Sequence, residues 1–156
     1  MVKRLDDSST PPLLTHIGWS LWRASDHWLR AFRARMVGAG YSWFSEARAN
    51  VIPHIDRAGT QQAVLAERMG LSKQAIQQFV DGLVADGVVQ RTPDPADARA
   101  RIVTFTPEGL SVLAAANRAK KSIEADYATR LGKARFDQLS KALVELNESL
   151  GDSTDE

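Results

Sequence analysis

The chain has 156 residues, of which 44% are hydrophobic and 25% are charged, and its net charge is +1. This length and composition are typical of a single globular domain, or of a small module with helical extensions. Cysteine is absent, which excludes disulfides, thiolate metal sites and cysteine nucleophiles. No apolar run approaches the roughly 18 residues of a membrane helix, and the N-terminus lacks the apolar stretch of a signal peptide. We therefore expect a cytoplasmic protein.

The N-terminal third of the chain predicts helices. Apolar residues recur at spacings of three and four over residues 14–31, as in an amphipathic helix, and the glycines at 38 and 40 end this pattern. A second helix is expected over residues 42–56, although Pro53 inside it would bend or break it. Thr60 is a candidate N-cap for the helix that follows.

Residues 60–105 predict two short helices joined by a tight turn and followed by a charged hairpin. The helices are expected over 61–69 and 73–86, with the turn at 70–72. The hairpin strands are expected over 88–91 and 101–105. This order of elements is that of a winged helix-turn-helix, a unit that binds DNA.

The C-terminal third predicts two more helices. Thr106-Pro107-Glu108 is a strong helix start, with a capping hydroxyl, a proline in the first turn and an acid near the positive end of the helix dipole. This helix can run to about residue 131, where Gly132 interrupts it. Apolar residues then recur at helical spacing, and such a stripe on a terminal helix requires a partner: Phe136, Leu139, Leu143, Leu146 and Leu150.

The second helix of the central motif has two distinct faces. Its apolar face comprises Ile76, Phe79, Val80, Leu83 and Val84. At about 100° per residue, Gln74, Gln77, Gln78 and Asp81 fall on the opposite face. A glutamine amide both donates and accepts hydrogen bonds, which suits the edge of adenine in the major groove. Ser72 is the expected N-cap, and Lys73 in the first turn suits a phosphate or a guanine.

The hairpin carries the charges expected of a DNA-binding wing. Arg99 and Arg101 would meet the DNA backbone or the minor groove, whereas Asp97 would be repelled by phosphate if it were unpaired. We therefore expect Asp97 to pair with Arg99 and fix its direction. Residues 60–105 hold five basic and five acidic residues, so DNA binding has to depend on where these charges lie.

Four segments of the chain resemble the MarR family of bacterial winged helix-turn-helix regulators: LAERMGLSKQA (65–75), DGLVADGVV (81–89), DPADARARIV (94–103) and TPEG (106–109). The resemblance implies a mainly α fold with a small β-hairpin wing, in which helical extensions hold a dimer. It implies dimerisation helices and a possible ligand cleft in residues 1–58, the DNA-binding module in 59–105 and dimerisation helices in 106–156. Position 98, often basic in this family, is Ala98 here, which implies one phosphate contact fewer.

Trp19 lies on the otherwise polar face of the first helix, beside Arg23. Packing in a dimer explains it, and so does a small-molecule pocket. The resemblance implies the pocket, because many family members bind aromatic carboxylates between the first two helices and the winged module. Trp19, Trp43 and Arg23, with help from His16, could hold such a ligand by stacking and ion pairing.

Two hypotheses for the function follow. The first is a dimeric, sequence-specific transcriptional regulator, a repressor released by a small aromatic ligand and bound to a pseudo-palindromic duplex. The second is a winged-helix module for protein association that does not bind DNA. The charged wing favours the first hypothesis. No catalytic motif, cofactor motif or metal-ligand spacing is recognisable, and His16 and His27 would lie about 16 Å apart on one helix.

Overall fold

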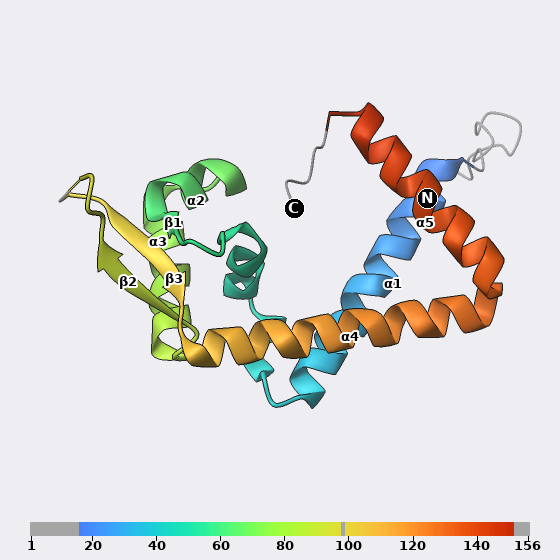
Figure 1. The fold of residues 1–156 in the computed structure, drawn as a ribbon, viewed down its shortest axis with the longest axis horizontal. Helices are drawn as coiled ribbons and strands as arrows, with labels where there is room; N and C mark the ends of the chain where they lie inside the picture. Colours follow the sequence, from blue (N-terminus) through green and yellow to red (C-terminus); the bar gives the residue numbers. More distant parts are fainter. Residues whose placement is uncertain (1–15, 98, 152–156) are drawn as a thin grey trace, which may run out of the picture.

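The computed structural model describes residues 16–97 and 99–151. In chain order the elements are α1 (Ile17–Gly38), η1 (Ser42–Ser45), η2 (Ala47–His54), β1 (Thr60–Gln61), α2 (Gln62–Met69), α3 (Lys73–Ala85), β2 (Val89–Pro93), β3 (Arg101–Phe105), α4 (Pro107–Leu131) and α5 (Lys133–Ser149). The mainly helical fold with a small antiparallel sheet confirms the predicted fold class. Figure 1 shows the sheet with α2 and α3 at one end of the molecule, α1 and α5 at the other, and α4 running between them. Within the described part of the chain, no helix is long and apolar enough to cross a membrane.

The single helix expected over residues 42–56 is wrong. The chain forms two 3₁₀ helices, η1 and η2, which are separated at Glu46, whose backbone is extended (φ −94°, ψ 158°). Pro53 lies inside η2 and has no N–H to donate to a helical hydrogen bond. The segment is instead held by burial of its apolar side chains: Trp43, Phe44, Ala49, Val51 and Ile52.

Thr60 belongs to a third strand that the sequence does not predict, and it is not an N-cap. Thr60 and Gln61 pair with Val103 and Ile102, so the sheet has the order β1-β3-β2. The Thr60 hydroxyl accepts a hydrogen bond from the Asp56 N–H at 2.8 Å and donates to the Asp56 carboxylate at 3.0 Å. A strand of two residues is too short to display an alternating pattern, which explains why it was missed.

The hydrophobic core lies at the sheet end of the molecule. It is centred on residues 42–105, which we call the winged module, and extends to Met36 of α1 and to the first half of α4. The core therefore draws residues from each of the three segments expected from the sequence. Its largest fully buried side chains include Met36, Val51, Leu65, Ile76, Leu83, Val103 and Val112.

The opposite end of the molecule has no comparable core. We call it the terminal arm: the first half of α1, the last two turns of α4, and α5. No described residue of α5 is buried. Trp19 and Trp22 stack on each other at a centroid distance of 4.8 Å, yet they remain 54% and 58% exposed. The large apolar side chains exposed on α5 and at its C-cap include Leu139, Leu143, Val144, Leu146 and Leu150.

Candidate nucleic-acid interface

The turn between α2 and α3 is built by a glycine and a serine. Gly70 ends α2 in the left-handed conformation (φ 62°), where residues with a Cβ are strained. The Leu71 N–H then donates to the Ala66 carbonyl at 3.0 Å. The Ser72 hydroxyl accepts a hydrogen bond from the Ala75 N–H at 3.1 Å, which confirms Ser72 as the N-cap of α3. These contacts fix the direction in which α3 leaves the turn.

The two faces of α3 lie as the sequence predicts, with one exception. Ile76, Val80 and Leu83 are buried, whereas Val84, expected among them, is 38% exposed. The polar side chains Lys73, Gln74, Gln77 and Gln78 are exposed, and their side chains make no hydrogen bond within the described part of the chain. These donors and acceptors are therefore available to an external partner.

The wing is a regular antiparallel hairpin closed by a tight turn. Strands β2 and β3 pair from Val89 opposite Phe105 to Pro93 opposite Arg101. In the turn, the Asp97 carboxylate accepts a hydrogen bond from the backbone N–H of Arg99 at 2.9 Å. No ion pair between Asp97 and the Arg99 guanidinium occurs among the described residues, so Asp97 fixes the backbone of Arg99 and not its side chain. A short carboxylate two residues before an N–H commonly makes such a turn.

Asp94 is a functional candidate that the sequence did not reveal. Its carboxylate is almost fully buried and accepts hydrogen bonds from the Ala96 N–H at 2.8 Å and from Nε2 of Gln61 at 2.5 Å. The Ala96 N–H, followed by the Gln61 amide, holds the pKa of Asp94 below its ordinary value, against the opposing effect of burial. Asp94 thus links the wing turn to β1. Asp94-Pro95 predicts a stiff turn, but no local pattern predicts its contact with Gln61.

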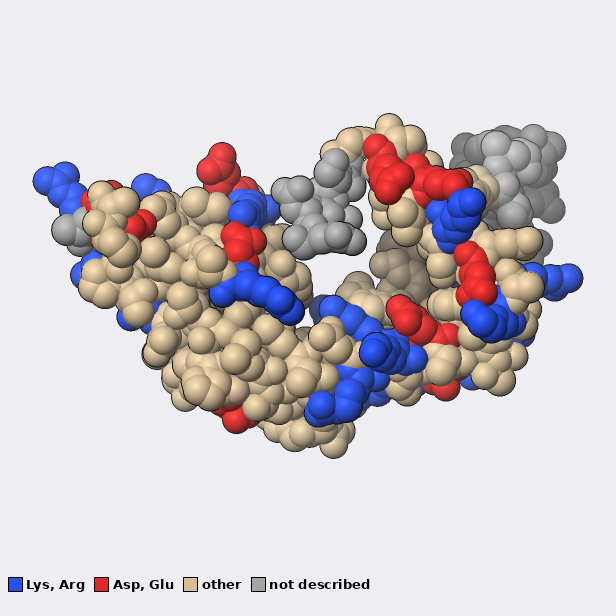
Figure 2. Space-filling model, in the orientation of Figure 1, with Lys and Arg blue, Asp and Glu red and all other residues tan. Residues whose placement is uncertain are grey.

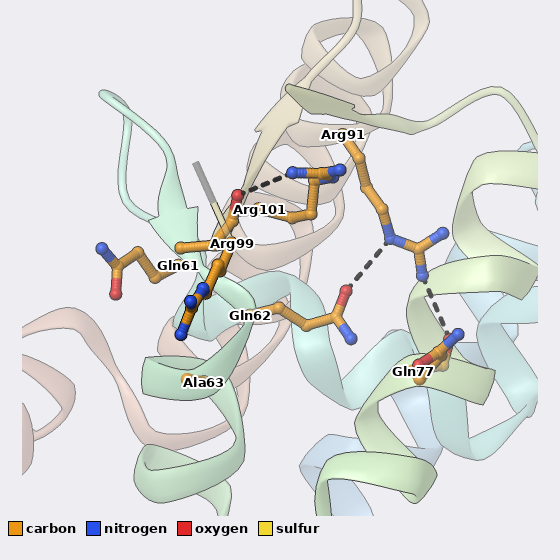
Figure 3. A pocket seen from close by; sticks show the side chains of 8 residues that line it. Gln61, Gln62, Ala63, Gln77, Arg91, Arg99 and Arg101 are labelled. Carbon is orange, nitrogen blue, oxygen red and sulfur yellow. Dashed lines mark hydrogen bonds between the residues drawn. The ribbon is translucent and has the colours of Figure 1, made fainter. Parts of the chain in front are cut away.

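A hollow of about 420 Å³ separates the wing from the helix-turn-helix. Figure 3 shows the side chains that line it, and three of the lining residues are arginines, while none is acidic: Gln61, Gln62, Ala63, Gln77, Arg91, Arg99, Ala100 and Arg101. Elsewhere charges are mixed. On the face shown in Figure 2, basic and acidic side chains alternate with uncharged ones. The hollow therefore brings three arginines together in a chain of nearly zero net charge, although the charge of Arg91 is balanced by the carboxylate of Asp81.

A second cavity, of about 380 Å³, lies between α1, η2 and α4. Its walls are mainly apolar, with Trp28 stacked on Phe32 at a centroid distance of 5.1 Å. Three cationic side chains, Arg33, Arg57 and Lys120, also line it. The remaining lining residues are Leu29, Phe44, Ala49, Asn50, Ile52, Pro53, Ile55, Phe105, Leu113, Ala116 and Asn117.

The residues expected from the sequence to bind a ligand do not line this cavity. Trp19 lies in the first turn of α1 and stacks on Trp22, whereas Trp43 follows the other end of α1 and packs on Phe44 in the core. Since α1 has 22 residues and is about 33 Å long, the two rings cannot close on one ligand within a chain. His16 and Arg23 are exposed and also lie outside the cavity.

A helix-turn-helix whose second helix is exposed beside a basic hairpin defines the winged helix-turn-helix class. The sequence profile of the MarR family matches residues 45–100. The transcriptional regulator HosA of Escherichia coli O111:H- is 34% identical over 76 residues, which are 49% of this chain and 56% of HosA. The winged module of this chain is therefore similar to that of MarR-family regulators. The relatives that match are transcriptional regulators, not enzymes.

Solved structures extend the likeness of fold beyond the winged module. Apo MarR from E. coli is 18% identical, with a TM-score of 0.72 over 86% of this chain and 98% of that one. The transcriptional repressor CouR, bound to a 23-mer DNA duplex, is 23% identical, with a TM-score of 0.66 over 84% of this chain and 92% of CouR. The helical extensions of this chain thus follow the layout of MarR-family structures.

Proposed function

We propose that this protein is a dimeric, sequence-specific DNA-binding transcriptional regulator, a repressor released by a small aromatic acid. The observation that carries the proposal is the exposed polar face of α3 beside the arginine-lined hollow. A DNA duplex offers both partners that this surface needs, namely base edges for the amides and phosphates for the cations. A regulator of this kind acts on chromosomal DNA, in the cytoplasm. The solved duplex complex of CouR, a protein of the same fold, supports the choice of partner.

Each exposed residue has a defined role in this proposal. Gln74, Gln77 and Gln78 contact base edges in the major groove, while Ser72 and Lys73 contact the backbone or the first base. The wing contributes Arg99 and Arg101 at the phosphates or in the minor groove. Asp97 acts indirectly by fixing the backbone from which Arg99 projects.

The terminal arm provides the dimer interface in this proposal. Its exposed leucines and its stacked tryptophans are too extensive an apolar surface to be left in water. A second copy of the chain covers them and places two α3 helices on one face of the duplex. The operator is then pseudo-palindromic, with half-sites about one helical turn apart.

The effector binds in the apolar cavity between α1, η2 and α4. Aromatic walls with a few cations at the edge suit an aromatic carboxylate, which stacks on Trp28 or Phe32 and pairs with Arg33, Arg57 or Lys120. We assign the effector to this cavity and not to Trp19 and Trp43, because those two rings lie at opposite ends of α1. The ligand can release DNA only to the extent that it prefers the conformation that does not bind DNA.

The DNA-binding proposal is tested by selecting duplexes from a random library with the purified protein and measuring their affinity by fluorescence anisotropy. The wild type is expected to enrich one pseudo-palindromic sequence. Gln77→Ala should cost about 1–3 kcal/mol on that duplex and relax the preference at one position. Arg118→Gln, on the exposed surface of α4 outside the winged module and the terminal arm, is the control. Enrichment of no sequence would favour the alternative, a module for protein association.

The effector proposal is tested by titrating the dimer with a panel of aromatic acids while tryptophan emission is recorded. A binding acid should change the emission and release the selected duplex. Trp28→Phe should remove most of the emission change, whereas Trp19→Phe, outside the cavity, should leave it. An acid that binds to each of the Arg33→Gln, Arg57→Gln and Lys120→Gln variants with the same affinity as to the wild type would contradict the assigned site.

A further inference from the structure

An acidic residue lies on the face of α3 that the proposed function turns toward DNA. Asp81 falls on the same side of the helix as Gln74, Gln77 and Gln78, and its side chain is 53% exposed. A carboxylate in this position repels the phosphates of a duplex. Contact with the DNA backbone is therefore disfavoured for Asp81, and its partner within the chain indicates another role.

That partner is Arg91, in the middle of β2. An Nη of Arg91 lies 2.6 Å from the Asp81 carboxylate. The other guanidinium nitrogens are also engaged: Nε donates to the side-chain oxygen of Gln62 at 3.0 Å, and the second Nη donates to the backbone carbonyl of Gln77 at 3.3 Å (Figure 3). One side chain of the wing thus contacts both helices of the helix-turn-helix across the hollow.

The engaged guanidinium distinguishes Arg91 from Arg99, which is proposed to contact DNA. All three of its nitrogens are directed at protein oxygens, and its side chain is only 24% exposed. Arg99, by contrast, is exposed, and its side chain makes no hydrogen bond or ion pair among the described residues. Arg91 is therefore poorly placed to bind a phosphate and well placed to hold the wing against α3.

We propose that Arg91 and Asp81 are positioning residues that tie the wing to the recognition helix α3, so that both contact one duplex in a fixed register. This inference rests on the proposed DNA binding. The strands of the wing have five residues each and are about 17 Å long, so a rotation of 10° at their base moves the tip by about 3 Å. Such a displacement removes a hydrogen bond to a base edge beneath the wing. The pair is partly exposed, so it adds little to the free energy of unfolding.

The test compares variants on the duplex that the wild type selects from a random library. Asp81→Asn removes a negative charge from the DNA-facing side, so simple electrostatics predicts tighter binding. If the pair positions the wing, the opposite is expected. Binding should be about three- to tenfold weaker, and the preference for particular bases beneath the wing should be lost. The dependence of the affinity on salt should be unchanged, because no phosphate contact is lost. Arg91→Gln should behave in the same way. Glu46→Gln, which breaks a pair with Arg48 of comparable exposure outside α3, the wing and the terminal arm, is the control for net charge.

Two further variants separate positioning from a general loss of structure. Asp81→Glu keeps a carboxylate and should retain the base preference beneath the wing. The double variant Asp81→Arg with Arg91→Asp restores the pair with reversed charges and should recover the preference that each single change removes. Thermal unfolding should be nearly the same for all of these proteins.

Either of two results would overturn the inference. In one, Asp81→Asn binds the selected duplex as tightly as the wild type or more tightly. In the other, Arg91→Gln makes the slope of log affinity against log salt shallower by about 0.9, the signature of a lost phosphate contact. Both results leave the DNA-binding proposal intact, because that proposal fails only if the wild-type protein selects no duplex.

Discussion

The helices α3 and α5 share a sequence pattern but lie in opposite environments. Both repeat apolar residues at spacings of three and four, yet Ile76, Val80 and Leu83 of α3 are buried, whereas no described residue of α5 is. The difference lies in what each helix meets within the chain. Helix α3 packs against η2, α2 and β2, while α5 contacts chiefly the end of α4. Periodicity therefore predicts which face of a helix is apolar and favours burial. Whether that face is buried within the same chain depends on the tertiary structure.

The comparison divides the molecule into a self-sufficient part and a dependent part. The winged module completes its core within one chain, so its stability should respond to substitutions at its packed contacts. The terminal arm leaves its apolar side chains exposed within one chain, so substitutions there should change the proposed association and leave the module folded.

The largest effect is expected at the joint between the wing and α4. A Cβ on Gly109 would lie 2.1 Å from the carbonyl oxygen of Val88, a backbone atom that cannot move aside easily. Gly109→Val should therefore lower the free energy of unfolding by about 3 kcal/mol or more, measured by denaturant unfolding. Gly38→Ala is the matched control: nothing lies within 4 Å of its Cβ, and it should be neutral or slightly stabilising. Equal stability of the two variants would contradict this account of the joint.

A charge on the arm should affect association and leave the fold intact. Leu143→Asp places a carboxylate in the stripe proposed to be covered by a second copy, at equivalent positions in both chains. The dimer dissociation constant should rise at least about 100-fold, because each leucine buried is worth about 1.5–3 kcal/mol. Sedimentation measures the change, and circular dichroism should be unaltered. Leu110→Asp alters a leucine of α4 that is 59% exposed and far from α5, and it should remain dimeric.

A smaller effect is expected from Asp97 in the wing turn. Asp97→Ala removes an acid from the DNA-facing surface but also the acceptor for the Arg99 N–H. The loss of one such hydrogen bond should weaken binding to the selected duplex by about 1 kcal/mol, measured by anisotropy. Asp97→Asn keeps an acceptor oxygen and should bind more tightly than the alanine variant. Tighter binding by Asp97→Ala than by the wild type would refute the role of Asp97 in ordering the turn.

The smallest effect expected is a pH dependence of amide hydrogen exchange in the wing turn. The pKa of Asp94 lies below its ordinary value of 3.8, chiefly because the Ala96 N–H and the Gln61 amide donate to its carboxylate. A lowered pKa contributes stability that is present above the ordinary value and is lost as the pH falls through the folded-state pKa. Amide exchange at Ala96 should therefore accelerate only under strongly acidic conditions. In Asp94→Asn this step should be absent, and a midpoint above 3.8 in the wild type would contradict the assignment.

The parts of the fold that could be predicted are those with strong local signals. The periodicity of α3, the left-handed Gly70, the Ser72 cap and the Thr106-Pro107 start of α4 each act within a few residues, and all are present. The missed features depend on contacts between distant segments. Strand β1 exists because β3 lies beside it, and the burial of Asp94 depends on Gln61, 33 residues earlier in the chain.

The candidate site residues also divide into those with a local sequence signal and those that depend on contacts between distant segments. The exposure of the glutamine face follows from helical geometry and could be predicted, whereas the tie between Asp81 and Arg91 joins a helix to a strand and could not. Trp43 was misjudged because a non-periodic segment gives no indication of which way an aromatic side chain points. Its ring is buried in the core together with that of Phe44, the other apolar residue of η1.

Helix α4 runs without a break, which limits the insertions that such a protein can accept in this helix during evolution. This helix has 25 residues and is about 37 Å long, and it carries the winged module at one end and the arm at the other. Each inserted residue would advance the arm by about 1.5 Å and turn it by about 100°, so only insertions near a whole number of turns, such as about seven or about eleven residues, restore the original phase. In the proposed dimer, the length of α4 therefore sets the distance between the two copies of α3, and this distance can change only in steps of whole residues.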